Sequence, residues 1–369
     1  MNHSQAMLGL SQVKGLGPVL IKRIVDHFGN NLSSLWECQE DFPDIPGISR
    51  TIKKALFSVD WQKAFQEEES LKRSGIKLLC YGEENYPDQL KYIYDPPSIL
   101  YQKGNCIPED NHSIAIVGTR KASLYALKQA YSLAQEMGKR GITVVSGLAR
   151  GIDIAAHRGA MATGGRTIAV LGSGLHSIYP PEHYQDTQRI MMQGSLLSEY
   201  PPETQPEAFH FPERNRIISG LSLGIVVIEA GIKSGAIITA HVALEQGKEI
   251  FALPGNIDNL QTQGCHRLIQ QGAKLFTNLD EILEEIMPLK HKILPPQESE
   301  KTPVFQLGEE EAIIWEILND SPQSLDTITY KVPLPPSTTT AKLLAMEMKG
   351  LVDLFPGQRY AKKRNLLTI

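Results

Sequence analysis

The chain has 369 residues, of which 41% are hydrophobic, and it carries a formal net charge of −4 with a pI of about 6.2. This length exceeds one ordinary hydrophobic core, so two or three domains are expected, and the charge excludes a uniformly basic surface, so any nucleic-acid contact must come from a local patch. The four cysteines are scattered without a CxxC pair, which argues against a zinc ribbon and a disulfide framework and is typical of a reducing cytosol. No apolar run approaches the roughly 20 residues of a membrane span and no apolar signal segment begins the chain, so we expect a cytoplasmic protein without membrane contact.

Residues 1–70 are predicted to form short helices with glycine hairpins between them. Residues 13–23 place Gly15 and Gly17 between two amphipathic patterns, and residues 45–54 resemble a degenerate second copy. Such hairpins turn tightly and offer backbone N–H groups to a DNA phosphate. A plain helical packing module explains the same pattern. A charged helix at 61–75, a strand at 76–81 and an irregular Pro- and Tyr-rich stretch are expected next.

From residue 113 the sequence alternates between strand and helix patterns. Strands are predicted at 113–117, 142–146, 167–171, 195–199, 224–229, 249–253 and 274–276, with helices at 125–140, 154–163 and 237–246. This alternation predicts an α/β fold with a Rossmann-like, doubly wound parallel sheet and right-handed crossovers. The near-continuous apolar runs at 168–171 and 225–228 are typical of strands buried on both faces.

The last part of the chain has a different composition. Residues 288–306 contain four prolines among mixed charges, which indicates a linker. Helices are then predicted at 310–318, 324–330 and 337–349, the third capped by Ser337 and ended at Gly350, with a hairpin after it. Three helices and a hairpin are typical of a winged helix whose third helix would read DNA. That helix is not strongly basic, so a protein-contact role stays open.

The loops that follow the predicted strands are rich in residues that suit phosphate. In a parallel sheet these loops share one edge, where ligands bind, and small residues, free N–H groups and Arg at helix starts favour phosphate. Ser123 is predicted to cap the helix after the first strand, and Asp153 to be the N-cap of the next one. The candidate residues are Gly118, Thr119, Arg120 and Lys121 after the first strand, Ser146, Gly147, Arg150 and Gly151 after the second, and Lys233, Ser234 and Gly235 after the fifth.

Residues 209–216 are interpreted as a further loop of the same kind. Basic residues interleaved with aromatic ones suit a single nucleic-acid strand, because phosphates need charge and bases need a stacking face. The alternative is that the phenylalanines are core and the arginines pair with Glu199 or Glu229. The candidate residues here are Phe209, Phe211, Arg214, Asn215 and Arg216.

Several common sites are missing from the sequence. No GxxxxGK[ST] segment is present, which disfavours an ATP motor, and Gly172-Ser-Gly174 lacks the third glycine of a nicotinamide site. The histidines have no metal spacing and no catalytic triad stands out. We therefore predict no cofactor and no metal, and these patterns identify no catalytic residue.

Five motifs in order nevertheless resemble a known family. They are Gly118-Thr-Arg120, Ser146-Gly-Leu-Ala-Arg-Gly-Ile-Asp153, the segment 211–219, the segment 229–240 and Ala252-Leu-Pro-Gly255. The chain is similar to the bacterial DNA-processing protein DprA (Smf) family over about residues 76–285. The resemblance implies a SAM-like or helix-hairpin-helix domain at 1–70, a Rossmann-like core at 71–287, the linker at 288–306 and a winged helix at 307–369.

The resemblance also implies a function. It implies a homodimer without catalysis that binds single-stranded DNA, protects incoming DNA during natural transformation and loads the RecA recombinase by displacing single-strand-binding protein. By the same resemblance, Arg120 is the DNA-binding arginine, and the segment 211–216 lines the pocket in which it lies. A lysine that precedes this segment in some members has no counterpart here. A nucleotide phosphoribohydrolase-like enzyme is the alternative, although the matching region, residues 229–235, lacks the PGG entry of that family's loop. A pure adaptor protein is a third hypothesis.

Overall fold

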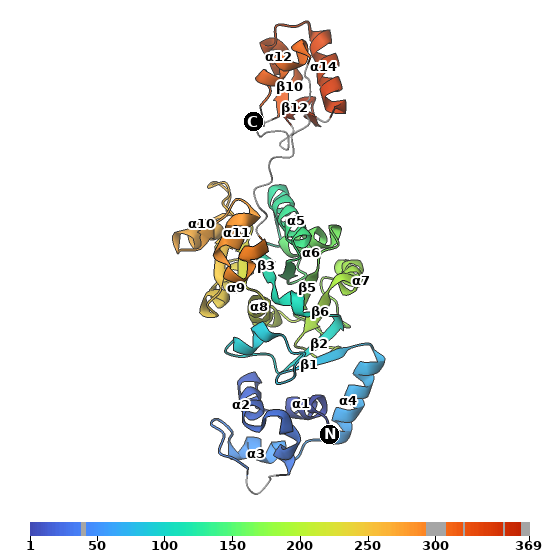
Figure 1. The fold of residues 1–369 in the computed structure, drawn as a ribbon, viewed down its shortest axis with the longest axis vertical. Coiled ribbons are helices and arrows are strands. Elements are labelled where there is room, and N and C mark those ends of the chain that lie inside the picture. Colours follow the sequence, from blue (N-terminus) through green and yellow to red (C-terminus); the bar gives the residue numbers. More distant parts are fainter. Residues whose placement is uncertain (38–41, 293–307, 320–321, 350, 363–369) are drawn as a thin grey trace. The chain divides into compact units, whose positions relative to one another are not determined.

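The structure is a computed structural model that describes residues 1–37, 42–292, 308–319, 322–349 and 351–362 (Figure 1). The chain divides into two compact units, Met1–Ile293 and Leu294–Ile369. The first unit contains the N-terminal helices and the large sheet, which share one hydrophobic core. The predicted boundaries at residues 70 and 287 therefore stay predictions, and residues 293–306 of the predicted linker lie outside the described residues.

The N-terminal helices contain the expected hairpins. Helices α1 (His3–Ser11) and α2 (Pro18–Phe28) flank the turn at Gly15, and α3 (Arg50–Leu56) follows the turn at Gly47. Both glycines have a φ near +90°, a conformation that favours glycine. The second copy is degenerate, as predicted, because a 3-10 helix, η1 (Gly29–Trp36), stands before its turn instead of an α-helix. Helix α4 (Trp61–Arg73) matches the predicted charged helix.

The sheet of the first unit is mixed, and its larger part is parallel. Its strand order is β1-β2-β6-β5-β4-β3-β7-β8-β9, with β3 to β9 parallel and β1 and β2 antiparallel at one edge. The strand order reverses between β3 and β7, as in a doubly wound fold. The strands are β1 (Lys77–Cys80), β2 (Ile99–Gly104), β3 (Ser113–Val117), β4 (Thr143–Ser146), β5 (Thr167–Leu171), β6 (Ser195–Ser198), β7 (Gly224–Val227), β8 (Glu249–Ala252) and β9 (Lys274–Leu275).

Helices cover both faces of the parallel strands (Figure 1). One core places alternate strand residues such as Ile114 and Ile116 against α5 and α6, and the other places Ala115 and Val117 against α8 and α9. The strands are therefore buried on both faces, as their continuous apolar sequences predict. The helices are α5 (Leu124–Lys139), α6 (Ile152–Ala162), α7 (Tyr184–Gln193), α8 (His210–Leu221), α9 (Gly235–Glu245), α10 (Gln263–Gln270) and α11 (Leu279–Glu285), with 3-10 helices η2 (Asp88–Tyr92), η3 (Pro108–Asn111), η4 (Pro181–His183) and η5 (Met287–Lys292).

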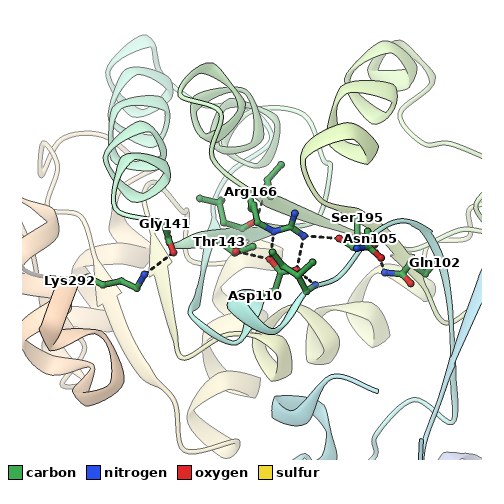
Figure 2. A network of polar contacts seen from close by, with 11 residues as sticks. Gln102, Asn105, Asp110, Gly141, Thr143, Arg166, Ser195 and Lys292 are labelled. Atoms are coloured by element: carbon green, nitrogen blue, oxygen red, sulfur yellow. Dashed lines mark hydrogen bonds and ion pairs between the residues drawn. The ribbon is translucent and has the colours of Figure 1, made fainter. Parts of the chain in front are cut away.

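A polar network ties together the amino ends of the parallel strands (Figure 2). The buried Asp110 carboxylate accepts two hydrogen bonds of 2.8 Å from Arg166, just before β5, and one of 2.8 Å from Thr143 in β4. Gln102 of β2 donates to Ser195 of β6 at 3.2 Å. These bonds fix strand positions at the edge opposite the loops that carry the candidate residues.

The second unit is a winged helix, as predicted. Helices α12 (Glu309–Ile317), α13 (Leu325–Lys331) and α14 (Pro336–Met348) pack on a three-stranded sheet of β10 (Gln323–Ser324), β11 (Val352–Phe355) and β12 (Arg359–Lys362). Its core contains Ile314, Ile328, Leu343 and Met346. None of the helices in the described part of the chain is long and apolar enough to cross a membrane.

Three sequence predictions are wrong in detail, and strand β2, which follows Pro97, was not predicted. Residues 210–221 are a helix instead of a loop. Gly151 occupies the N-cap position of α6, so Asp153 is not its cap. Ser337 does not cap α14, because that helix begins at Pro336 with Pro335 as its N-cap. The predicted helix end at Gly350 lies outside the described residues.

Candidate nucleic-acid interface

The loops after β3, β4 and β7 surround one open cavity of about 820 Å³ at the switch point of the sheet. We call it the switch-point cavity. Ligands of open α/β sheets bind at this place, where neighbouring loops diverge. Its lining includes the predicted residues Gly118, Thr119, Arg120, Phe211, Arg214, Asn215, Lys233, Ser234 and Gly235.

The loop after β3 is held by the buried Glu229 at the end of β7. The Thr119 N–H donates to the Glu229 carbonyl oxygen at 2.6 Å, and the Ser123 N–H donates to its carboxylate at 2.8 Å. Asn259, from the loop after β8, donates to the other carboxylate oxygen at 3.1 Å. Ser123 also caps α5, as predicted, by accepting from the Ala126 N–H. Glu229 therefore joins the loops after β3, β7 and β8 next to the cavity.

The loop after β4 rests on a buried pair of charges. Asp153 accepts from the N–H groups of Gly147 and Ala149 at 3.2 and 3.3 Å. Arg214 donates from α8 to the carbonyl oxygens of Gly147, at 2.7 Å, and Val170. Burial raises the pKa of Asp153, against the nearby Arg214 charge, and lowers the pKa of Arg214 to about 10. Arg214 thus supports the loop and also lines the cavity.

An aromatic ring and a guanidinium face each other in the cavity. Arg120, which is exposed, places its guanidinium carbon 5.4 Å from the centre of the Phe211 ring, a cation–π geometry. Tyr179 lies 5.8 Å from that ring, and Phe211 packs where a side chain at Gly172 would clash. The ring is held by packing on one side and meets the positive charge on another.

Lys233 adds a further exposed cation where α9 begins. Ser234 caps this helix by accepting from the Ala236 N–H at 3.3 Å. Asp153 is the only carboxylate among the cavity-lining residues that the structure describes, against the cations Arg120, Arg214 and Lys233. A cavity with this charge and with N–H groups at a helix start suits an anion such as phosphate.

The remaining candidate residues lie outside this cavity. Lys121 and Gly151 line an adjacent cavity, and Ser146 and Gly147 are buried or covered beneath the loop after β4. Arg150 is half exposed, pairs with Glu182 at 2.5 Å and lies over Tyr179, while Phe209 is exposed beside His210.

Arg216 serves the fold. It forms ion pairs with Glu199 at 2.7 Å and Asp95 at 2.9 Å, and its side chain is 12% exposed. The alternative weighed from the sequence, in which an arginine of this segment pairs with Glu199, holds for Arg216.

Tyr179 and Gln261 line the cavity without having been predicted. Tyr179 precedes two prolines in the loop after β5. An aromatic residue in a loop at the ligand-binding edge of the sheet could have been recognised from the sequence as a candidate. Gln261 accepts from the Thr119 hydroxyl at 3.2 Å, a contact over 142 positions that local patterns do not reveal.

Comparisons with known proteins agree with this architecture. A model of the family described as DNA recombination-mediator protein A matches residues 77–287, and a model described as DprA winged helix domain matches residues 298–358. Protein Smf of Synechocystis is 35% identical over 98% of this chain and 100% of its own length. DNA processing protein DprA of Streptococcus pneumoniae is 44% identical over 66% of this chain and 86% of its own.

Two solved structures are similar as well. The X-ray structure of DprA from Streptococcus pneumoniae has a TM-score of 0.68 at 35% identity and covers 78% of this chain and 99% of its own. DNA processing protein A from Helicobacter pylori, in a study of its single-stranded DNA binding mode, has a TM-score of 0.52 at 30% identity and covers 58% and 96%. With a family match over most of the sheet-bearing unit and a relative aligned along nearly its whole length, this chain belongs to the DNA recombination-mediator protein A family, also called DprA or Smf.

Proposed function

We propose that this chain is a recombination mediator that binds single-stranded DNA in the switch-point cavity. The observation that carries the proposal is the pairing of Arg120 with the Phe211 ring in an open, net cationic cavity. A single strand exposes both phosphates and base faces, and a duplex hides the base faces by stacking. A cation beside an aromatic ring therefore fits a single strand. The family membership and the single-stranded DNA named for the Helicobacter pylori relative support this choice.

The residues of the cavity would have different roles in binding. Arg120 and Lys233, exposed on the loops after β3 and β7, would hold consecutive phosphates, with the Gly235 N–H at the start of α9 as a further donor. Phe211, with Tyr179 beside it, would offer a stacking face to a base. Arg214 and Asp153 would keep the loop after β4 in place. No contact to a base edge is needed, so binding would be independent of sequence.

The finer role belongs to the same proposal. The protein would protect incoming DNA during natural transformation, displace single-strand-binding protein and load the RecA recombinase, acting in the cytoplasm as a homodimer. We assign single-strand binding to residues 71–287. The helical region 1–70 and the winged helix 307–369 would then supply contacts to duplex DNA or to protein.

The first test is fluorescence anisotropy of labelled oligo-dT with the full chain at two salt concentrations. Binding should weaken with salt by a slope of about −0.7 in log K per phosphate contact. Arg120→Glu should weaken it strongly and flatten that slope. Lys139→Glu is the matched control, because it reverses another exposed charge at the end of α5, at the opposite edge of the sheet.

The outcomes separate the possibilities. Absence of dT binding at low salt would refute single-strand binding. Equal losses for Arg120→Glu and Lys139→Glu would mean that net charge, and not this cavity, governs affinity. If Arg120→Glu alone weakens binding, RecA filament formation on DNA coated with single-strand-binding protein tests the loading role.

A further inference from the structure

A second cavity lies directly beside the switch-point cavity, in a groove between α5 and α6. Its volume is about 580 Å³, and we call it the helix groove. Arg120 lines both cavities, so the two meet at this side chain. The helices pack closely here because Gly159 of α6 has no side chain, and a Cβ at this position would clash with the Tyr131 carbonyl oxygen of α5.

The lining of the helix groove is basic. Arg120 and Lys121 stand at its mouth, Lys128 lies on α5 and Arg158 on α6, and all four are exposed. The side chains of Lys121 and Lys128 make no ion pair within the described part of the chain, whereas Arg158 is paired with Asp186 at 2.8 Å. The lining residues described by the structure include no carboxylate. In a chain with a net charge of −4, such a run of cations is a local anion-binding surface.

The groove also offers apolar and aromatic surface between these charges. Leu127 and Tyr131 lie on one wall, and Ile154 and Ala155 on the other. Tyr131 follows Lys128 by three positions on α5, so both side chains lie on the same face of that helix. Cations interleaved with an aromatic ring repeat, outside the first cavity, the combination that suits a single strand.

We propose that the bound strand leaves the switch-point cavity past Arg120 and continues along the helix groove, with its backbone on Lys121 and Lys128. This inference rests on single-strand binding in the first cavity. Lys128 would be a DNA contact outside the strand-end loops and their motifs, because it lies on helix α5. The groove lengthens the footprint, so it matters for long DNA and not for a strand that fills the first cavity alone. Arg158, compensated by Asp186, contributes less than Lys128.

The test compares a short and a long oligo-dT of roughly 4 and 20 nucleotides. Lys128→Glu should weaken binding of the long oligo several-fold and leave the short one unchanged, and Lys128→Gln should reduce the salt slope for the long oligo by about 0.7. Lys139→Glu is the control on the same helix. It makes the same charge change roughly 16 Å further along α5, outside the groove lining.

Each outcome decides one point. If neither oligo binds the wild-type chain, the single-strand function itself fails. If both bind but Lys128→Glu and the wild type share the same affinity for the long oligo, the groove is not a DNA path. Equal losses on the short and the long oligo would place Lys128 in the first cavity and overturn the extended path. A Lys139→Glu loss as large as that of Lys128→Glu would reduce the effect to net charge.

Discussion

Gly151 couples the two loops that border both cavities, and its substitution tests that coupling. It has a φ of +77°, and a Cβ built on it would lie well inside 3.0 Å of the Thr119 carbonyl oxygen. That oxygen accepts from the Ile152 N–H at 3.3 Å, which draws the loop after β3 against the start of α6. In Gly151→Ala the loop must therefore shift by on the order of 1 Å to reach an ordinary carbon–oxygen contact.

Gly164→Ala is a matched control for the backbone cost. Gly164 has a similar φ of +71°, with no atom near its missing side chain. Gly164→Ala should lose about 1–2 kcal/mol of unfolding free energy from the positive φ alone. Gly151→Ala should lose at least as much, because its ψ of −120° lies outside the left-handed helical region. Only Gly151→Ala displaces Arg120. If that breaks one hydrogen bond to a charged phosphate, worth about 1.5–3 kcal/mol, the Kd for oligo-dT rises about 10- to 150-fold.

The assay combines urea unfolding with anisotropy on both variants. Unfolding gives the folded fraction, so that the Kd refers to folded protein only. Gly164→Ala should bind like the wild type. If the two variants bind oligo-dT equally well while differing in stability, the loop after β3 does not need the position that Gly151 gives it, and the reasoning is refuted.

Two further substitutions give independent expectations. His157 is buried and donates from Nδ1 to Thr167 at 2.6 Å, because the Thr167 hydroxyl itself donates to the Val144 carbonyl oxygen. Its Nε2 has no hydrogen-bond partner among the described residues, and burial lowers the pKa of His157 to about 3. Below pH 6.5 the unfolded chain therefore binds a proton at His157 that the folded chain does not bind. The free energy of unfolding falls as the pH drops from 6.5 toward 3, by about 2 kcal/mol between pH 7 and 5. The urea midpoints of His157→Asn should lose this part of the pH dependence, and an unchanged pH dependence in the variant would contradict the reasoning. Phe211→Leu keeps an apolar side chain but removes the stacking face, so oligo-dT affinity should drop by about 1–3 kcal/mol with an unchanged salt slope, and a flatter slope in anisotropy would show that the ring acts through Arg120 instead.

Much of the sheet could be predicted because buried parallel strands are apolar along their whole length. The ends of β3 and β5 match the predicted ends, and the other parallel strands differ by one or two residues. Strand β2 was missed because Pro96 and Pro97 stand just before it and carry a turn signal. A long irregular connection separates it from β1, and β6 lies far away in the sequence, so no local pattern reveals the antiparallel edge.

The segment 211–216 shows why the site could be predicted only in part. Its residue types indicated a nucleic-acid contact, but Pro212 and the polar residues hid a helix, since proline is tolerated in a first helical turn. In a helix, residues two positions apart point in directions roughly 200° apart. Arg214 therefore faces the cavity while Arg216 faces Glu199 on the other side. An extended loop would have placed both arginines on one side.

Glu229 gives the cavity a collective character. The loops after β3, β7 and β8 have no regular secondary structure of their own. The loops after β3 and β8 nevertheless both donate hydrogen bonds to Glu229, which belongs to the loop after β7. Local opening of any one of them removes a partner from a buried charge, and this is costly unless the others rearrange too. In amide hydrogen exchange the three loops would thus behave as one cooperative unit. A ligand held by one of these loops would slow exchange in the other two, including residues that it never touches.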